Sequence, residues 1–192
     1  LLRPMFSRPG VPDVDSLGLI CTITQDDEKF IWLVGKNGLA RYDGYKVDVF
    51  RHNANIANSL SSNDISDMLV DRKGRLWIAT LSGGGLNRFD AATQSFIHYR
   101  HDLNNPNSLS SDAVYALAED SNGYLWIATH EGLNRLNPET GEVYRHVHTQ
   151  SQDMAVRDIA IDRFDTLWAA THLQGLYRLD LSRLDLATPN TN

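Results

Sequence analysis

Residues 71–90 read DRKGRLWIATLSGGGLNRFD, and this stretch decides the fold because it occurs four times along the chain. The other copies are DDEKFIWLVGKNGLARYD at 26–43, DSNGYLWIATHEGLNRLN at 120–137 and DRFDTLWAATHLQGLYRLD at 162–180. Each copy contains an acid, a tight turn, an apolar arm around a tryptophan, a break, and then a Gly-Leu pair followed by an arginine. Self-similarity at a fixed period indicates a repeat architecture.

Three positions recur in every copy, and we assign them to structure. We expect the acid, six residues before the tryptophan, to accept backbone N–H groups across the turn. The tryptophan is large enough to fill the gap between one unit and the next. The glycine permits close backbone approach beside that ring. The residues are Asp26, Asp71, Asp120 and Asp162; Trp32, Trp77, Trp126 and Trp168; and Gly38, Gly85, Gly132 and Gly175.

Each copy belongs to a cycle of four short strands, and such a cycle in a unit of roughly 40–50 residues is typical of a β-propeller blade. The sequence therefore predicts an all-β fold of about four four-stranded antiparallel blades. Their expected bounds are residues 19–52, 64–101, 112–148 and 156–180. The remaining residues are an N-terminal segment, 1–18, which could supply a closing strand, and a C-terminal tail or truncated outer strand, 181–192.

Two further positions of the repeat lead to structural expectations: the glycine of the first hairpin turn and an arginine near the end of the unit. Gly74 and Gly123 supply the positive φ that the first hairpin turn needs, whereas Lys29 and Asp165 replace that glycine, so strain is expected there. An arginine follows each repeat glycine by three residues, and we expect it to pair with turn acids or with acids of the neighbouring blade. These arginines are Arg41, Arg88, Arg135 and Arg178.

Composition narrows the function classes. A net charge of −6 and a pI near 5.6 argue against nucleic acid as a partner. No apolar run approaches the roughly 18 residues that cross a bilayer, and LLRPMFSRPG at the start does not resemble a signal peptide. We therefore expect membrane contact only through segments outside this sequence. Cys21 is the single cysteine, so neither an internal disulfide nor a cysteine metal cluster is expected.

The repeat, D-x-x-G-x-L-W-I-A-T followed by G-L-N-R-F-D, resembles the two-component regulator propeller repeat. The connector NSLSS, at residues 58–62 and again at 107–111, strengthens the resemblance. The resemblance implies the extracytoplasmic, periplasmic sensor region of a bacterial membrane protein, chiefly a hybrid histidine kinase or a diguanylate cyclase. The resemblance also implies that complete sensors of this type form rings of about seven blades, often two rings in tandem. Four blades therefore suggest part of a larger ring, or self-association into a dimer or higher oligomer that completes one.

The candidate ligand site lies in the short loops between the second and third strands of each blade, which should open onto the same face as the connections between blades. Polar groups at such a mouth orient small polar ligands. The residues are Lys36, Asn37, His130, Glu131, His172 and Gln174. The alternative is loop polarity without a ligand. His146 and His148 share one face of an outer strand, where solvent-exposed histidines are a better interpretation than metal ligands, so no metal is expected.

No nucleophile elbow, zinc-helix motif or Walker loop occurs, so an enzyme is not expected, nor is a cofactor. The favoured function is a sensor that binds a small molecule or an oligosaccharide and signals to an output domain. The main alternative is a scaffold whose blades bind another protein and no small molecule. A propeller lyase or hydrolase is a lesser alternative.

Overall fold

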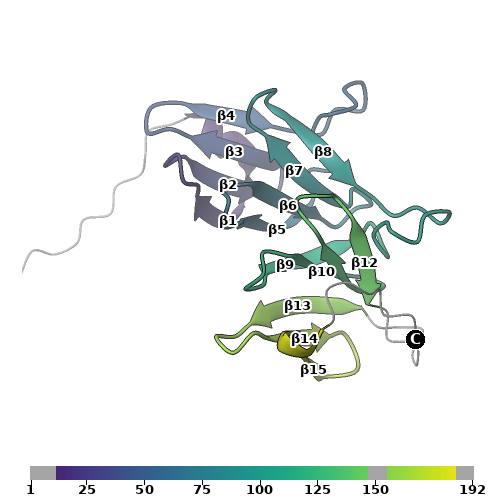
Figure 1. Cartoon of the computed structure of the whole chain (residues 1–192). Helices are drawn as coiled ribbons and strands as arrows, with labels where there is room; N and C mark the ends of the chain where they lie inside the picture. Colours follow the sequence, from purple (N-terminus) through teal and green to yellow (C-terminus); the bar gives the residue numbers. More distant parts are fainter. Residues whose placement is uncertain (1–11, 147–154, 185–192) are drawn as a thin grey trace, which may run out of the picture.

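The computed structural model describes residues 12–146 and 155–184, which fold into four antiparallel sheets (Figure 1). The first contains β1 (Ile20–Gln25), β2 (Ile31–Gly35), β3 (Gly38–Tyr42) and β4 (Val47–Phe50). The second contains β5 (Ile65–Val70), β6 (Leu76–Thr80), β7 (Leu86–Asp90) and β8 (Ser95–Tyr99). The third contains β9 (Val114–Glu119), β10 (Leu125–Thr129), β11 (Gly132–Leu136) and β12 (Val143–His146). The fourth contains β13 (Val156–Ile161), β14 (Thr166–Thr171) and β15 (Leu176–Asp180).

Every sheet is a simple meander in which each strand pairs with the next one along the chain. Three sheets have four strands and the last has three, so the predicted all-β class of about four blades is confirmed. The described parts of the two terminal segments form short 3-10 helices, η1 (Pro12–Leu17) and η2 (Leu181–Arg183), where we had considered strands. Residues 1–11, 147–154 and 185–192 lie outside the description. No helix in the described ranges has the length and apolar character of a membrane span.

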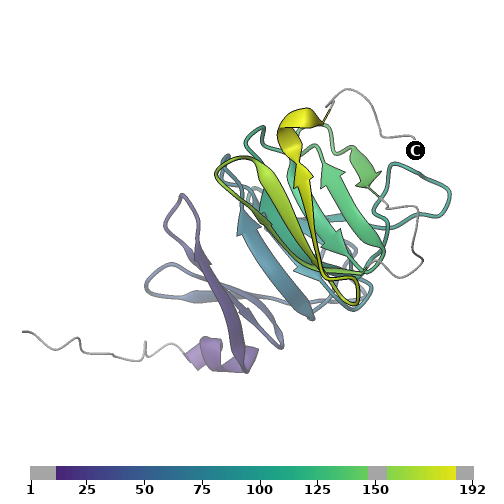
Figure 2. The ribbon, with the colours of Figure 1, turned by 90° about the horizontal axis from the view of Figure 1, so that it is seen from below.

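The blades stand side by side in chain order (Figure 2). Their first strands contact one another in succession, β1 with β5, β5 with β9 and β9 with β13. The first strand of each blade is therefore the inner one, and the later strands lie progressively further out, as in a propeller. This arrangement gives the molecule two faces. Loops between second and third strands lie at one end of the sheets, and the hairpin turns after first and third strands lie at the other.

The turn acid of each repeat accepts a hydrogen bond from the indole N–H of its own tryptophan. The distances from Nε1 to Oδ2 are 2.7 Å for Trp32–Asp26, 2.9 Å for Trp77–Asp71, 2.8 Å for Trp126–Asp120 and 3.0 Å for Trp168–Asp162. The other carboxylate oxygen accepts backbone N–H groups across the turn, as Asp71 Oδ1 does from Lys73 and Arg75, both at 3.0 Å. One side chain thus fixes both the turn and the ring.

Three of the four indoles pack against the blade that follows their own. Trp32 lies in a core cluster with Met68 of the second blade. Trp77 lies in a cluster with Val114 of the third blade, and Trp126 in a cluster with Val156 of the fourth. These three rings are buried, whereas Trp168 of the last described blade is only half-buried. The tryptophans are therefore the packing contacts between neighbouring blades.

At Gly38 and Gly85, the neighbour that excludes a side chain differs from the expected indole, whereas a Cβ on Gly175 would meet no atom within 4 Å. A Cβ on Gly38 would lie 2.6 Å from the carbonyl oxygen of Phe50, and one on Gly85 would clash with the carbonyl oxygen of Tyr99. The close approach is thus to the outer strand and not to the indole. The turn residues Lys29 and Asp165 have φ of 72° and 60°, the left-handed region that costs a side chain free energy. Strain at these two turns agrees with the loss of glycine there.

The expectation that the repeat arginines pair with turn acids or with acids of the neighbouring blade is wrong for Arg41, and Arg135 contacts aromatic rings instead. Arg41 pairs with Asp48, at 2.9 Å, which lies on the outer strand of the same blade and not in a turn. No acid in the described part of the chain pairs with Arg135; its guanidinium lies 4.8 Å from the ring centre of Tyr124 and 5.3 Å from that of Tyr144. Tyr144 occupies the strand register that Asp48 holds in the first blade, so an aromatic face replaces the carboxylate.

His146 is half-buried against Trp126, with 5.0 Å between ring centres, so the expectation of a solvent-exposed histidine is wrong. Burial, together with the nearby positive charge of Arg135, lowers the pKa of His146 from 6.5 to about 4. The other histidine of that pair, His148, lies outside the described residues.

Removing one turn acid should destabilise the protein according to how deeply its tryptophan is buried. Asp71→Ala leaves the buried indole N–H of Trp77 without an acceptor, and such a group costs about 1–3 kcal/mol. Asp162→Ala should cost less, because water can reach the half-buried Trp168. Urea unfolding followed by fluorescence measures both free energies. Equal losses in the two variants would contradict the role of burial.

The stability of the protein should fall between pH 6.5 and about 4 because of His146. Its folded pKa lies below 6.5, so the unfolded chain binds the proton first and stability is lost as the pH decreases through this window. The variant His146→Gln cannot titrate and should lose less stability over the same range. Urea unfolding midpoints at pH 7 and pH 5 measure the difference. If the midpoint falls by the same amount in both proteins, this effect is ruled out.

Candidate functional site

The loops between second and third strands meet the connections between blades at one end of the sheets. The first residue of each loop donates its backbone N–H to the carbonyl of a residue just before the inner strand. These bonds are Lys36–Leu19 at 3.1 Å, Leu81–Asp64 at 2.9 Å, His130–Ala113 at 3.0 Å and His172–Ala155 at 2.9 Å. We call this end, formed by loops 36–37, 81–85, 130–131 and 172–175 and the adjoining connectors, the connection face.

The NSLSS connectors are fixed to the blades by buried hydrogen bonds. The backbone N–H of Ser61 donates to Asn87 Oδ1 at 3.0 Å, and Asn87 Nδ2 donates to Ser61 Oγ at 2.7 Å. Ser110 and Asn134 repeat both bonds, at 2.9 and 2.8 Å, one blade further on. All four residues are buried. The connectors therefore form a preorganised rim for the connection face.

All four inner strands carry a register shift at the same position next to this face. The shifts lie between Ile20 and Thr22, between Ile65 and Asp67, opposite Thr129, and between Val156 and Asp158. A bulge of this kind re-aims a side chain and is frequent beside functional sites. The residues at the bulges are Cys21, Ser66, Tyr115 and Arg157.

Between the first two blades the connection face is hollowed into a cavity of about 640 Å³. Lys36 and the bulge residue Cys21 lie on the side of the first blade, and Asp64 and Ser82 lie on the side of the second. The connector adds Ser61, Ser62, Asn63 and His52, and the Nδ1 of His52 lies 2.9 Å from the Leu60 carbonyl. The volume is in the range of small-molecule sites. Donors and acceptors face one another across it, which suits a ligand rich in hydroxyl groups.

At the third blade the bulge residue Tyr115 contacts the predicted site residue His130, and Arg157 of the fourth blade lies over the Tyr115 ring. The Tyr115 hydroxyl lies 3.5 Å from His130 Nδ1, and the guanidinium carbon of Arg157 lies 4.3 Å from the centre of the Tyr115 ring. Arg157 and His130 are exposed. This group offers a cation, an imidazole and a phenol on one part of the face.

The predicted site residues have different surroundings within the connection face. Lys36 lines the cavity, His130 contacts Tyr115, and Glu131 and His172 are exposed loop residues. Asn37 holds the N-terminal helix η1, because its backbone N–H donates to Leu17 at 3.1 Å and its side chain lies 3.4 Å from the Ser16 carbonyl. Gln174 Oε1 accepts a hydrogen bond from the Tyr177 hydroxyl at 3.0 Å. The six residues thus belong to three separate loops on one face.

Sequence reasoning missed Tyr115, Arg157 and His52. Tyr115 and Arg157 stand in strands that read as ordinary alternating segments, and the bulge that re-aims them leaves no signal in one sequence. His52 could have been found, because it recurs as His101 in the next connector, where Nδ1 again faces a leucine carbonyl.

Comparison with known proteins agrees with this architecture. Residues 59–82 and 108–131 match the family model described as two component regulator propeller. Both segments run from a connector serine through the inner strand and the tryptophan strand to the next loop. A comparison with curated protein sequences gives no match.

Solved structures share the fold at low sequence identity. The extracellular domain described as that of a hybrid two component system of B. thetaiotaomicron is 24% identical over 85% of this chain, with a TM-score of 0.76. PorZ, a surface component of the type-IX secretion system of Porphyromonas gingivalis, is 20% identical over 84%, with a TM-score of 0.62. Virginiamycin B lyase from Staphylococcus aureus is 13% identical over 90%, with a TM-score of 0.60.

The chain spans only part of each of these proteins: 23% of the B. thetaiotaomicron domain, 26% of PorZ and 58% of the lyase. Likeness at this level of identity shows a common fold, whereas the two matched segments show a common repeat. The chain therefore carries repeats of the two component regulator propeller family on an all-β propeller fold.

Proposed function

We propose that the chain is a ligand-sensing part of the extracytoplasmic region of a bacterial signalling protein, and that its connection face binds a small polar molecule or an oligosaccharide. The observation that carries the proposal is the polar cavity of about 640 Å³ at the mouth of the regulator repeats. The structure from B. thetaiotaomicron that shares the fold is an extracellular domain, and this supports our proposal that the chain is periplasmic.

The chemistry of the face supports a hydroxyl-rich ligand. The Lys36 ammonium group donates to ligand oxygens, and the Asp64 carboxylate accepts from ligand hydroxyls across the cavity. Arg157 and His130 supply further donors on the other half of the face. Because the connectors are fixed by buried bonds, little ordering is required when a ligand binds.

Binding becomes a signal only if the ligand prefers one arrangement of the protein over another. We propose that this arrangement is the geometry in which copies of the propeller associate. A histidine kinase or a diguanylate cyclase, attached through a membrane segment outside this sequence, would respond to it. The role assigned to this chain is binding without turnover.

A thermal-shift panel of glycans and polar metabolites tests the sensing function. A ligand at 100 times its Kd adds about 2.7 kcal/mol of stability, which raises the Tm of a domain this size by about 5–10 °C. Lys36→Ala and Arg157→Ala should reduce the shift and leave the unliganded Tm nearly unchanged, because both side chains are exposed. Arg183→Ala, in η2, is the matched control and should keep the full shift.

If no compound of the panel raises the Tm and the protein retains a protein partner in a pull-down, the sensing function is wrong and the scaffold function is favoured. Consumption of a panel compound by the purified protein would instead favour a lyase or hydrolase, the class of one protein that shares the fold.

Exposed apolar side chains at the two ends of the row of blades support self-association. Leu176 begins β15 and is 65% exposed, whereas the equivalent Leu39 and Leu86 are 0% exposed. Ile23 of β1 is 65% exposed, whereas the equivalent Met68 of β5 is 7% exposed. Within residues 12–146 and 155–184, the first and last blades thus each have a neighbouring blade on one side only. We propose that the last blade of one copy packs on the first blade of a second copy, giving a ring of eight blades.

Light scattering should therefore give twice the 21.6 kDa mass of one chain. Ile23→Glu or Leu176→Glu places a charge in the proposed contact and should shift the mass toward one chain. Leu103→Glu is the control, because this leucine is exposed in a connector away from both ends. A mass of one chain at high protein concentration would overturn the proposed dimer without affecting the proposed ligand site.

A further inference from the structure

The sequence Asp-x-x-x-Asp-Arg occurs twice in the chain, at residues 67–72 of the second blade and at residues 158–163 of the fourth. We call it the seam motif, a seam being the line along which two neighbouring blades meet. Its second aspartate is the turn acid of the repeat. The first and third blades have other residues at its two ends. In the second blade both ends of the motif bind the blade that follows.

The first aspartate of the motif links two inner strands. Oδ1 of Asp67 accepts the backbone N–H of Met68, its neighbour in the chain, at 2.7 Å. Oδ2 accepts the backbone N–H of Leu117, in the inner strand of the third blade, at 2.8 Å. A hydrogen bond to an ionised carboxylate is among the stronger ones in proteins. Asp67 therefore fixes the third blade to the second near the axis of the propeller.

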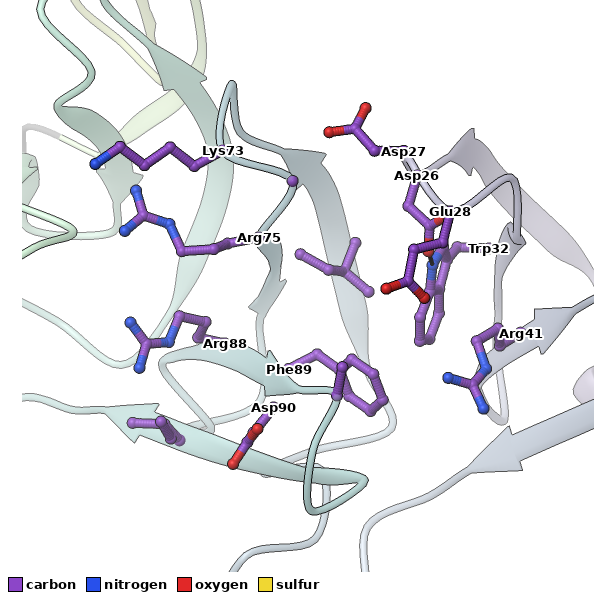
Figure 3. A pocket seen from close by; sticks show the side chains of 14 residues that line it. Asp26, Asp27, Glu28, Trp32, Arg41, Lys73, Arg75, Arg88, Phe89 and Asp90 are labelled. Atoms are coloured by element: carbon purple, nitrogen blue, oxygen red, sulfur yellow. Dashed lines mark hydrogen bonds between the residues drawn. The ribbon is translucent and has the colours of Figure 1, made fainter.

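The arginine of the motif occupies the same seam on the face opposite the connection face. The guanidinium of Arg72 donates to the carbonyls of Asp120 and Ser121 and pairs with Glu119 at 2.8 Å. Between the first and second blades Asp27 stands in the position of Arg72, and the cavity there is about 550 Å³, compared with about 240 Å³ beside Arg72 (Figure 3). The seam that contains the guanidinium is thus the narrower one.

The motif of the fourth blade binds no following blade in residues 12–146 and 155–184. Oδ1 of Asp158 accepts the N–H of Ile159 at 2.9 Å, as Asp67 does from its neighbour, but in the described chain Oδ2 accepts no hydrogen bond. Arg163 forms no hydrogen bond or ion pair with any described residue, and its guanidinium lies over the ring of Phe164. Both side chains are exposed. The last blade therefore presents an acceptor and a donor at the positions that hold the third blade on the second.

The first blade presents a backbone donor for the aspartate. Ile23 occupies the repeat position of Leu117 but is 65% exposed, whereas Leu117 is 7% exposed. Ile23 lies opposite Leu33 in the pairing of β1 with β2, just as Leu117 lies opposite Ile127 in the pairing of β9 with β10. Because N–H directions alternate along an antiparallel strand, this shared register directs the Ile23 N–H away from β2, as it directs that of Leu117 toward Asp67.

The first blade also presents acceptors for the arginine. Gln25 stands in the position of Glu119, and its Nε2 donates to the carbonyl of Lys29 at 3.2 Å, which leaves Oε1 as an acceptor. The carbonyls of residues 26 and 27 correspond to the two that Arg72 binds. The two ends of the row of blades are therefore complementary in hydrogen-bonding groups as well as in exposed apolar side chains.

We propose that Asp158 and Arg163 bind the first blade of a second copy of this chain. Asp158 accepts the backbone N–H of Ile23, and Arg163 donates to Gln25 Oε1 and to the carbonyls of residues 26 and 27. The inference rests on the proposed self-association and names the groups that recognise the partner. Two polar contacts in each seam between copies fix one register, which apolar contacts alone do not specify.

Sedimentation of a dilution series measures the dissociation constant of the dimer. Arg163→Ala and Asp158→Ala should each raise this constant by about tenfold, because each removes charge-assisted hydrogen bonds. Both side chains are exposed in the single chain, so the Tm of the diluted monomer should stay unchanged. Arg183→Ala, in η2, is the matched control and should dimerise as the wild type does.

A gain of affinity tests the contact from the first blade. Gln25→Glu supplies the carboxylate that Glu119 provides to Arg72, so it should lower the dissociation constant by about tenfold. In the Arg163→Ala background the same exchange should bring no gain, because its partner is missing. An equal effect of Gln25→Glu in both backgrounds would contradict the contact.

The same series separates this inference from the self-association on which it rests. A wild-type dimer with an unchanged dissociation constant in Arg163→Ala and Asp158→Ala would overturn the inference and leave the self-association intact. A mass of one chain at every concentration would overturn both.

Discussion

The structure depends on the hydrogen bond between a turn carboxylate and an indole six residues later. In each blade it joins a tight turn to a large ring, and three of the four rings pack against the following blade. Asp71 shows how the carboxylate remains charged although it is buried. Burial raises its pKa, but the hydrogen bonds from Trp77 and the Arg75 backbone, together with the Arg75 side chain, outweigh burial and lower it. Local turn geometry and blade-to-blade packing are therefore set by the same side chain.

Because this unit repeats, differences between the blades carry the information about function. The repeat fixes the backbone, and single positions then vary on both faces. On the connection face the variable positions produce a polar cavity at one seam and an arginine–tyrosine–histidine group at another. On the opposite face, one position holds Arg72 in one seam and Asp27 in the next, and the seam with the acid is open.

Much of the fold could be predicted from the sequence because its signals are local and occur in four copies. The blade order, the turn acids and the strain at Lys29 follow from spacing and from the chemistry of single residues. Partners across strands could not be predicted, since they depend on register. Arg135 stacks on Tyr144 because that tyrosine stands where the first blade has Asp48. For the site, the loops could be placed, but Tyr115 and Arg157 could not, because backbone irregularities determine where they point.

All four inner strands have a register shift at the same point, and the side chain there can vary while the strand pairing stays the same. A thiol, a hydroxyl, a phenol and a guanidinium occupy the same point of the repeat, at Cys21, Ser66, Tyr115 and Arg157, with the neighbouring pairing unchanged. A position that accepts four such different groups is under little steric demand from the core. Propellers of this design can thus acquire new recognition properties through single exchanges around the mouth, without a compensating change in the scaffold.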